Sequence, residues 1–257
     1  MARDRSEQAS KDAWAYAAAQ MLRTTGQARY GEDFKKACVW SENPNAPLDQ
    51  YNKYNQAAAA WAYVNCGDAQ VDPELHAAVR KAILGTADGL VRNARTLAYA
   101  FIKHPWAPIN WGTGAYENFL TPVTWAYYLT GDETYLKWMI HTCDNTLGAN
   151  PLNLSWIVDL GTNTIRAPLH NSRYGHSGEV APGIECEGPS QNADGYRVKE
   201  TFFPPWEGRK KFPPLYTFVD AHFAIVMDEG VVSAQAKTMA TFGLLLPDHE
   251  EAKTAGK

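Results

Sequence analysis

The chain has 257 residues, a formal net charge of −4 and a hydrophobic content of 45%. This length allows one large hydrophobic core, and the composition is too apolar for a disordered chain. Lysine and arginine are scattered rather than gathered into a stripe, which excludes a nucleic-acid-binding surface. No apolar run approaches the roughly 20 residues that span a bilayer, and the opening MARDRSEQAS lacks the apolar core of a signal peptide. We expect a globular protein that binds neither nucleic acid nor membrane.

The cysteines and aromatic residues give weaker signals. The four cysteines, at positions 38, 66, 143 and 186, form no Cys-x-x-Cys pair. We interpret them as buried thiols rather than as zinc or redox ligands. Nine tryptophans and thirteen tyrosines suit either a packed core or a sugar-binding cleft, because their rings combine a flat apolar face with a polar edge.

The first part of the chain has the pattern of helical hairpins. Apolar residues recur at helical spacing over residues 7–25, Gly26 marks a stop, and the same period returns over residues 30–40. Residues 54–91 contain a break at Gly67 and a helix start at Asp72-Pro73. These features predict two pairs of antiparallel helices.

A third pair is predicted over residues 123–147, where Thr130-Gly131-Asp132 separates two amphipathic runs. No alternating, β-branched stretch is long enough for a strand, so we predict an all-α fold and not a parallel sheet. Repeated helical hairpins form either an open solenoid or a closed α/α barrel. The unequal length of these repeats favours the barrel.

The character of the sequence changes after Gly148. Residues 149–226 are rich in Pro, Gly, Asn and Ser, and show no clear element. A loop region of this length inside a compact domain is usually functional. A last helix is expected over residues 229–246.

The stretch MDEGVVSAQA opens this last helix. On structural grounds Asp228 suits an N-cap, Glu229 suits the first turn, and the apolar residues Val232, Met239 and Leu246 fall on one stripe. A capped and packed helix explains these residues without any chemistry. Two carboxylates that follow a long loop region also fit an active site, and the order of the preceding segments favours that second interpretation.

Those segments resemble a known enzyme family. Residues 147–163, LGANPLNLSWIVDLGTN, are similar to the Gly-x-Asn-Pro-x-x-x-Ser-aromatic segment of glycoside hydrolase family nine, the endoglucanase and cellulase family. APLHNSRYGH, with Pro168, His170 and Arg173, stands where that family has Pro-His-His-Arg. The second His is absent here and the Arg is displaced.

The remaining matches follow in the family's order. Pro182-Gly183 and the EGPS of residues 187–190 occupy the places of its Pro-Gly and Gly-Gly-Pro-Asn segments. Asp228-Glu229 then matches the Asn-Glu at the head of its last apolar helix. The serial order supports the resemblance more than any single motif does.

The resemblance implies an (α/α)6 barrel that hydrolyses β-1,4-linked glucan with inversion. Glu229 would be the general acid that protonates the glycosidic oxygen. His170, Arg173 and Asp228 would contact the substrate. For His170 and Arg173 the alternative is a loop histidine and a solvated arginine. Because Asp228 replaces the family's Asn, the glucan need not be plain cellulose.

Trp111 and Tyr116, in INWGTGAYENF, are further candidates for substrate binding. They begin an expected helix at a position where barrel openings place ligand contacts. Core packing is the alternative interpretation of both rings.

The family's general base comes from an early Asp-x-Gly-Asp motif, which this chain lacks. Several acids of the loop region are candidates for that role: Asp159, Glu179, Glu185, Glu187, Asp194 and Asp220. We expect one domain over residues 1–257, with a loop-rich cleft segment at about 148–227, corresponding to the later part of the family's catalytic module.

The predicted barrel is incomplete, because we count about seven or eight helices against about a dozen in the family. The chain is a piece of a longer or cleaved protein, a partner chain supplies the rest, or the barrel is truncated. We favour the first explanation, since an open ring would expose apolar helix faces.

Other classes are less well supported. The chain has no Gly-x-Ser-x-Gly motif, no phosphate-binding glycine loop and no His-x-x-x-His spacing. We expect no required cofactor and assign no metal ligand, although structural calcium is known among the family's members. A non-catalytic carbohydrate-binding or scaffold module is the main alternative, and a helical interaction domain is a third. The resemblance implies a secreted protein that acts on β-glucan or a related oligosaccharide.

Overall fold

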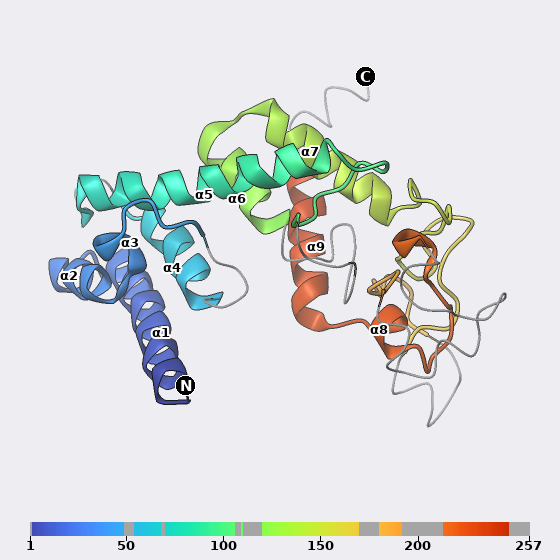
Figure 1. Cartoon of the computed structure of the whole chain (residues 1–257), viewed down its shortest axis with the longest axis horizontal. Helices are drawn as coiled ribbons and strands as arrows, with labels where there is room; N and C mark the ends of the chain where they lie inside the picture. Colours follow the sequence, from blue (N-terminus) through green and yellow to red (C-terminus); the bar gives the residue numbers. More distant parts are fainter. Residues whose placement is uncertain are drawn as a thin grey trace, which may run out of the picture. The chain divides into compact units, whose positions relative to one another are not determined.

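The computed structural model describes residues 2–48, 54–67, 70–105, 109, 120–169, 180–191 and 213–246 (Figure 1). This described part is helical and contains no β-strand, only isolated bridges between extended residues. The predicted all-α class is therefore confirmed. None of the described helices is long and apolar enough to cross a membrane. All four cysteines are buried free thiols, as predicted.

Packing divides the chain into two compact units, Met1–Gly89 with Trp125–Gly131, and Leu90–Thr124 with Asp132–Lys257. The prediction of one domain over the whole chain is not tested by this division and stays a prediction. The first unit holds α1 (Ala2–Thr25), α2 (Ala28–Ala37), α3 (Val39–Glu42), α4 (Tyr54–Val64) and most of α5 (Pro73–Ala94).

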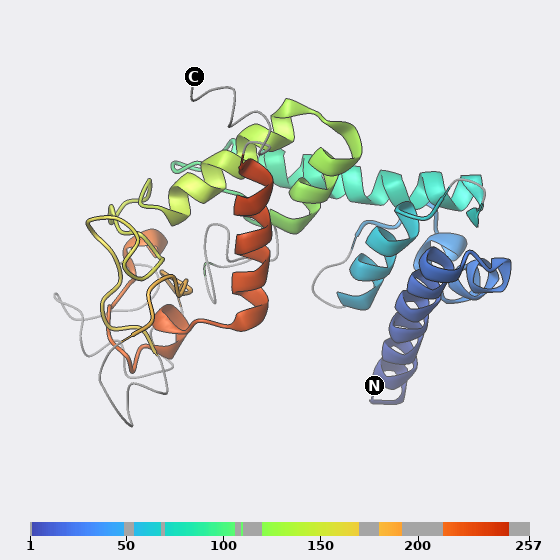
Figure 2. The same cartoon turned by 180° about the vertical axis from the view of Figure 1, so that it is seen from behind.

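In the first unit α1 packs against both α2 and α4, which the front and back views show side by side (Figures 1 and 2). The predicted stop at Gly26 is confirmed: this glycine has φ +68° and donates its N–H to the Leu22 carbonyl at 2.8 Å. Only glycine adopts this left-handed conformation without steric cost, so α1 ends there.

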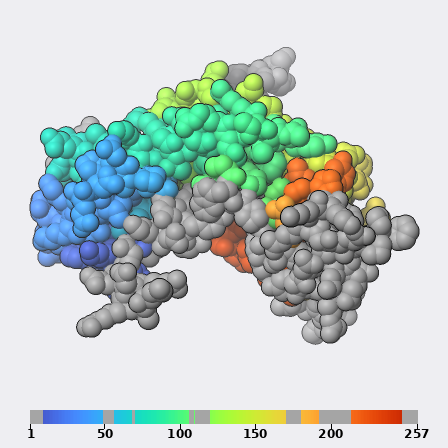
Figure 3. Space-filling model, in the orientation of Figure 1, coloured from blue at the N-terminus to red at the C-terminus, as the bar shows by residue number. Residues whose placement is uncertain are grey.

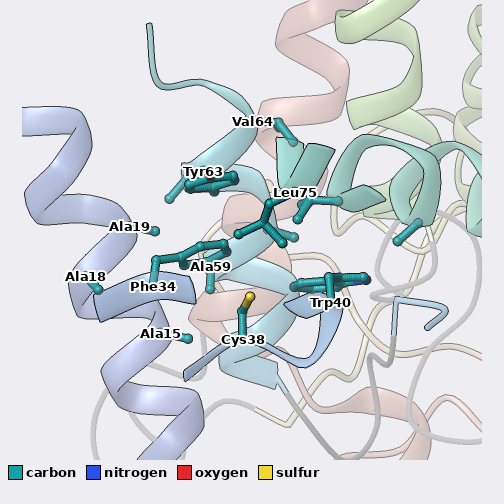
Figure 4. Packing of buried hydrophobic residues seen from close by; sticks show 14 of the residues in the cluster. Ala15, Ala18, Ala19, Phe34, Cys38, Trp40, Ala59, Tyr63, Val64 and Leu75 are labelled. Atoms are coloured by element: carbon teal, nitrogen blue, oxygen red, sulfur yellow. The ribbon is translucent and has the colours of Figure 1, made fainter. Parts of the chain in front are cut away.

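The core of the first unit is built from aromatic and small residues (Figure 4). The rings of Phe34 and Tyr63 stack with centroids 4.1 Å apart, and Trp40 is 1% exposed. The predicted start of α5 is also confirmed, because the Asp72 carboxylate accepts the N–H groups of Glu74 and Leu75 at 3.0 and 3.2 Å. Such capping satisfies donors that the first helical turn leaves unpaired.

The second unit contains α7 (Glu133–Thr146), the 3₁₀ turn η6 (Pro214–Tyr216), α8 (Ile225–Asp228) and α9 (Val232–Leu245). The helix α6 (Leu120–Thr130) ends in the first unit. The predicted break between α6 and α7 is confirmed. Gly131 has φ +67°, and Asp132 caps α7 by accepting the Thr134 N–H at 2.8 Å.

The last helix begins later than the sequence predicts. Asp228 is not its N-cap: it ends the short helix α8, Glu229 is extended, and α9 starts at Val232 after the N-cap Val231. The cause is tertiary, because the backbone of residues 227–229 hydrogen-bonds to distant segments instead of continuing a helix. Local patterning therefore misplaced the helix start.

The predicted apolar stripe of α9 is exposed in this structure. Val232 is 84% exposed, Met239 73% and Leu246 72%. The buried face carries Ala234, Thr238 and Thr241 instead, and α9 packs against α7. The segments coloured orange to red, which include α9, reach the surface on the face shown in Figure 3.

Candidate functional site

Extended segments from distant parts of the second unit meet to form the frame of the candidate site. The Trp156 N–H donates to the Thr146 carbonyl at the end of α7, at 2.9 Å. The Cys186 N–H in turn donates to the Trp156 carbonyl at 2.8 Å, and Ile157 forms an antiparallel bridge with Glu185. These bonds fix the segment around Glu185 relative to α7.

The same frame holds Glu229 by its backbone. The Glu187 N–H donates to the Glu229 carbonyl at 3.1 Å, and the Gly188 N–H donates to the Met227 carbonyl at 2.8 Å. Leu169 and Glu229 form a parallel bridge, in which the Leu169 N–H donates to the Asp228 carbonyl at 2.9 Å. The segments that resemble the enzyme family in sequence thus come together around Glu229.

Gly230 permits this close approach. A Cβ at this position would lie 2.9 Å from the Glu185 carbonyl oxygen and 2.9 Å from Cγ2 of Ile184. Neither distance is compatible with a side chain, so only glycine fits without displacing the frame. The Glu229 side chain itself is half-buried.

A small apolar cluster supports the frame from within. It contains Trp156, Val158, Ile165 and Cys186, all buried. The ring of Phe218 meets Trp156 edge to face, with centroids 5.0 Å apart. Trp156 therefore belongs to the packed core, and its ring offers no surface to a ligand.

Asp228 is a buried acid. None of its surface is exposed, and its Oδ2 accepts the Ala221 N–H at 2.9 Å. Burial raises its pKa to about 9, against the opposing effect of the Ala221 hydrogen bond, and the nearby charge of Asp220 adds to the rise. A carboxyl with this pKa holds its proton at neutral pH. The predicted substrate contact of Asp228 stays a prediction, and its contacts in this structure are with protein.

Glu185 is a second buried acid, with 2% of its surface exposed. Burial raises its pKa to about 8, while the Thr238 hydroxyl of α9 acts to lower it. Neither carboxylate oxygen has hydrogen-bond geometry with another described group. Burial raises the pKa of the Cys143 thiol on α7 to about 12, and the nearby charge of Glu185 adds to the rise.

Comparison with known proteins assigns the family. Residues 4–224 match the family description "Glycosyl hydrolase family 9". The chain belongs to this family. "Endoglucanase D" of Acetivibrio thermocellus is 26% identical over 171 residues, which are 65% of this chain and 26% of that protein.

Solved structures of family 9 endoglucanases share the fold. Endoglucanase J30 superposes with a TM-score of 0.77 at 22% identity, over 93% of this chain and 43% of the other. AaCel9A, solved in complex with cellobiose-like isofagomine, gives a TM-score of 0.73 at 17% identity, over 92% of this chain and 43% of the other. The chain thus has part of the family's α/α barrel and spans less than half the length of these relatives.

The family match ends at residue 224, five residues before Glu229 by the numbering. The assignment of Asp228 and Glu229 to the family 9 module therefore rests on the backbone frame and on the sequence resemblance alone. Their roles stay predictions. A signal that sequence reasoning passed over is the glycine directly after the acid pair, which marks a close backbone contact.

Asp220 has a structural function that sequence reasoning missed. Its carboxylate accepts the N–H groups of Ala167 and Arg166 at 2.7 and 2.9 Å. It thereby ties the segment before α8 to the segment that leads to Leu169. Asp159, another candidate base, is exposed and has φ +58°.

Several predicted site residues of this family 9 chain lie outside the described residues. These are His170, Arg173, Trp111 and Tyr116, together with the candidate bases Glu179 and Asp194. Leu169, the neighbour of His170 in the chain, is described and pairs with Glu229. Within the described ranges no group of His, Cys, Asp and Glu side chains is arranged to hold a metal ion.

Proposed function

We propose that this chain contributes the general acid for inverting hydrolysis of β-1,4-linked, cellulose-like glucan, and that Glu229 is that acid. The observation that carries the proposal is the pairing of Leu169 and Glu187 with residues 228–229 in a chain of family 9. This pairing joins the segments whose order in the sequence first indicated glycoside hydrolysis. The relatives' names as endoglucanases support the substrate class.

In the proposed step Glu229 donates its proton to the glycosidic oxygen as the bond to the leaving sugar breaks. Its immediate neighbour Asp228 stays protonated at neutral pH, because burial raises its pKa to about 9. Asp228 therefore adds no negative charge beside the acid. Glu229 also lies outside the first turn of α9, where the helix macrodipole acts most strongly.

The general base is proposed to lie outside the described residues or in the rest of the family module. Glu185 and Asp228 are enclosed by protein, so neither can activate a water at the open face of a sugar. Asp220 uses both carboxylate oxygens to accept backbone N–H groups. An inverting pair requires a carboxylate roughly 6.5 to 9.5 Å from the acid.

We further propose that the protein is secreted, since a polymeric glucan is met outside the cell, and that its ligand is an oligosaccharide. AaCel9A was solved with a cellobiose-like ligand, which supports this class of ligand. The two-carboxylate mechanism requires no cofactor.

The test compares the unchanged chain with Glu229→Gln, each completed with the part of endoglucanase J30 that has no counterpart here, so that a general base from the rest of the module is supplied. Glutamine keeps the size of the side chain and removes its acidic proton. Reducing ends released from soluble β-glucan report hydrolysis, and titration with cello-oligosaccharides reports binding. We expect a loss of at least about 10²-fold in rate with binding retained. Glu133→Gln, at an exposed position in the first turn of α7, is the matched control, because that acid is not among the candidate site residues. Full activity of Glu229→Gln would contradict the assignment.

A non-catalytic carbohydrate-binding module is the second candidate function. It is favoured by one observation, that the described acids around Glu229 are enclosed or engaged by the backbone. The same experiment separates the two. Binding of oligosaccharide by both proteins without release of reducing ends supports the binding module, and absence of binding in both supports a helical interaction domain.

A further inference from the structure

Two buried polar side chains lie where α9 meets the frame. Glu185 belongs to the frame and is 2% exposed, and Thr238, on the buried side of α9, is 4% exposed. Both carboxyl oxygens of Glu185 and the hydroxyl of Thr238 are buried, and none has hydrogen-bond geometry with another described group. Leaving such atoms unpaired is unfavourable and uncommon in folded proteins. The Thr238 hydroxyl is nevertheless near enough to Glu185 to act on its pKa as a hydrogen-bond partner.

Thr238 differs from other buried threonines of the second unit in how its hydroxyl is used. The hydroxyls of Thr142 and Thr146 on α7 each donate to the carbonyl four residues earlier in their own helix. Thr241, one turn after Thr238 on α9, does the same at 3.0 Å. This local bond is the usual solution for a threonine inside a helix. The hydroxyl of Thr238 makes no such bond and is left for a group outside the helix, which is Glu185.

The protonated form of Glu185 suits this contact. A neutral carboxyl and a hydroxyl can each donate and accept one hydrogen bond, whereas a carboxylate only accepts. Burial raises the pKa of Glu185 to about 8, against the effect of the Thr238 hydroxyl, so the acid is neutral at pH 7. Its titratable neighbours are the thiols of Cys143 on α7 and Cys186 in the frame, whose pKa values burial raises. The charged residue of α9, Lys237, is half-buried.

The segment of Glu185 also contacts the backbone on both sides of Glu229. The Glu187 N–H donates to the Glu229 carbonyl at 3.1 Å, and a Cβ on Gly230 would lie 2.9 Å from the Glu185 carbonyl oxygen. The helix α9 begins two residues after Gly230 and packs against α7 (Figures 1 and 2). A contact between Glu185 and Thr238 therefore fixes the helix that follows Glu229 to the frame that holds it.

We propose that Glu185 is a positioning residue for Glu229, and that its protonated carboxyl binds the Thr238 hydroxyl and holds α9 against the frame. Loss of the proton places a charge inside the protein, which favours separation of α9 from the frame. The consequence for hydrolysis rests on the proposed role of Glu229 as general acid, whereas the contact itself does not. Because a displacement of about 1 Å lowers a rate by up to about 10²-fold, the effect is expected in kcat.

Hydrogen exchange of the Glu187 N–H measures how firmly the frame holds Glu229, and it requires no activity. Thr238→Val keeps the shape of the side chain and removes the hydroxyl, so we expect this exchange at pH 6 to be about tenfold faster. Thr241→Val is the matched control, because that hydroxyl bonds within α9, and it should leave the rate unchanged. The Cys38 N–H, bonded to a carbonyl of the first unit, reports general unfolding. Equal acceleration of both amides by Thr238→Val overturns the proposal.

Glu185→Gln tests the role of the proton. Glutamine keeps the size of the side chain and both a donor and an acceptor for Thr238, but it does not ionise. We expect the Glu187 exchange rate of the unchanged chain, relative to that of Glu185→Gln, to rise about tenfold between pH 7 and 9. The pKa of Asp228 is raised to about 9, and its titration contributes equally to both proteins. A constant ratio of the two rates overturns the proposal, since a purely structural side chain gives no such pH dependence.

Hydrolysis by the chain completed with the J30 part supplies a second measurement. Thr238→Val should lower kcat at least about tenfold and leave KM nearly unchanged, while Thr241→Val should change neither. If Glu229→Gln retains full activity, the proposed function fails, and the exchange measurements still decide whether Glu185 holds α9. An unchanged kcat for Thr238→Val, in an enzyme that requires Glu229, overturns the positioning role.

Discussion

Leu169 and Glu229 lie opposite each other in a parallel bridge, although they belong to segments far apart in the chain. The Leu169 N–H donates to the carbonyl of Asp228 at 2.9 Å, and the Glu187 N–H donates to that of Glu229 at 3.1 Å. The position of Glu229 is therefore set by backbone bonds on two sides and not by the helix that follows. Substitutions in this frame should therefore shift the position of Glu229 even though they leave its own side chain unchanged.

Gly230→Ala is the most direct such change. The new methyl group would lie 2.9 Å from the Glu185 carbonyl oxygen, so the two segments must separate. We expect the free energy of unfolding to fall by about 1–3 kcal/mol, the range found for overpacked sites. Urea unfolding measures this loss.

Gly85→Ala is the matched control for that substitution. Gly85 lies inside α5, is exposed, and a Cβ there would meet nothing within 4 Å. Alanine should therefore raise the free energy of unfolding by up to about 1 kcal/mol through helix propensity. Equal effects of the two substitutions would show that Gly230 is not a steric requirement.

Asp72 offers a second test, at the start of α5. Its Oδ1 accepts two backbone N–H groups, and its Oδ2 lies 2.7 Å from Lys35 Nζ. We expect Asp72→Ala to lower the free energy of unfolding by about 1 kcal/mol, mainly through loss of the cap. Asp72→Asn keeps a capping oxygen but loses the charge, and should cost less because exposed ion pairs contribute little. If asparagine costs as much as alanine in urea unfolding, the ion pair and not the cap is responsible.

Local signals explain what the sequence predicted well. Gly26, Asp72-Pro73 and Asp132 each act within one helical turn, so their residue types alone indicate where a helix ends or begins. The predicted start of the last helix was wrong because aspartate is a residue type that favours the N-cap position. In the structure the Asp228 carbonyl instead accepts the Leu169 N–H. No local pattern encodes a bond to a segment so distant in the chain.

The candidate site was predicted in outline for a similar reason. The order of family-like segments indicated which residues meet, and the frame brings Leu169, Glu187 and Glu229 together. The same order does not reveal which acids are buried. In the sequence, nothing distinguishes Glu185 and Asp228 from Asp220 and Asp159. Only the packing of the folded chain shows that the first two acids are buried and the last two are exposed.

Those two buried acids predict how stability depends on pH. Burial raises the pKa of Asp228 from an ordinary 3.8 to about 9, and that of Glu185 from 4.5 to about 8. At a pH between the ordinary and the raised pKa of each acid, the folded protein holds a proton that the unfolded chain has released. The contribution of each acid to the free energy of unfolding is therefore complete below its ordinary pKa, and it is lost as the pH rises through its pKa in the folded protein. Each acid contributes a slope of at most about 1.4 kcal/mol per pH unit.

Urea unfolding between pH 5 and 8 measures this slope. We expect the free energy of unfolding to decrease as the pH rises, and Asp228→Asn and Glu185→Gln each to reduce the decrease. The asparagine carbonyl can still accept the Ala221 N–H, so the first variant removes the titration while keeping the contact. Asp144→Asn, at an exposed position on α7, serves as the control and should leave the slope unchanged. A wild-type slope that survives both substitutions would mean that these carboxyls are ionised in the folded protein, with partners that satisfy their charge.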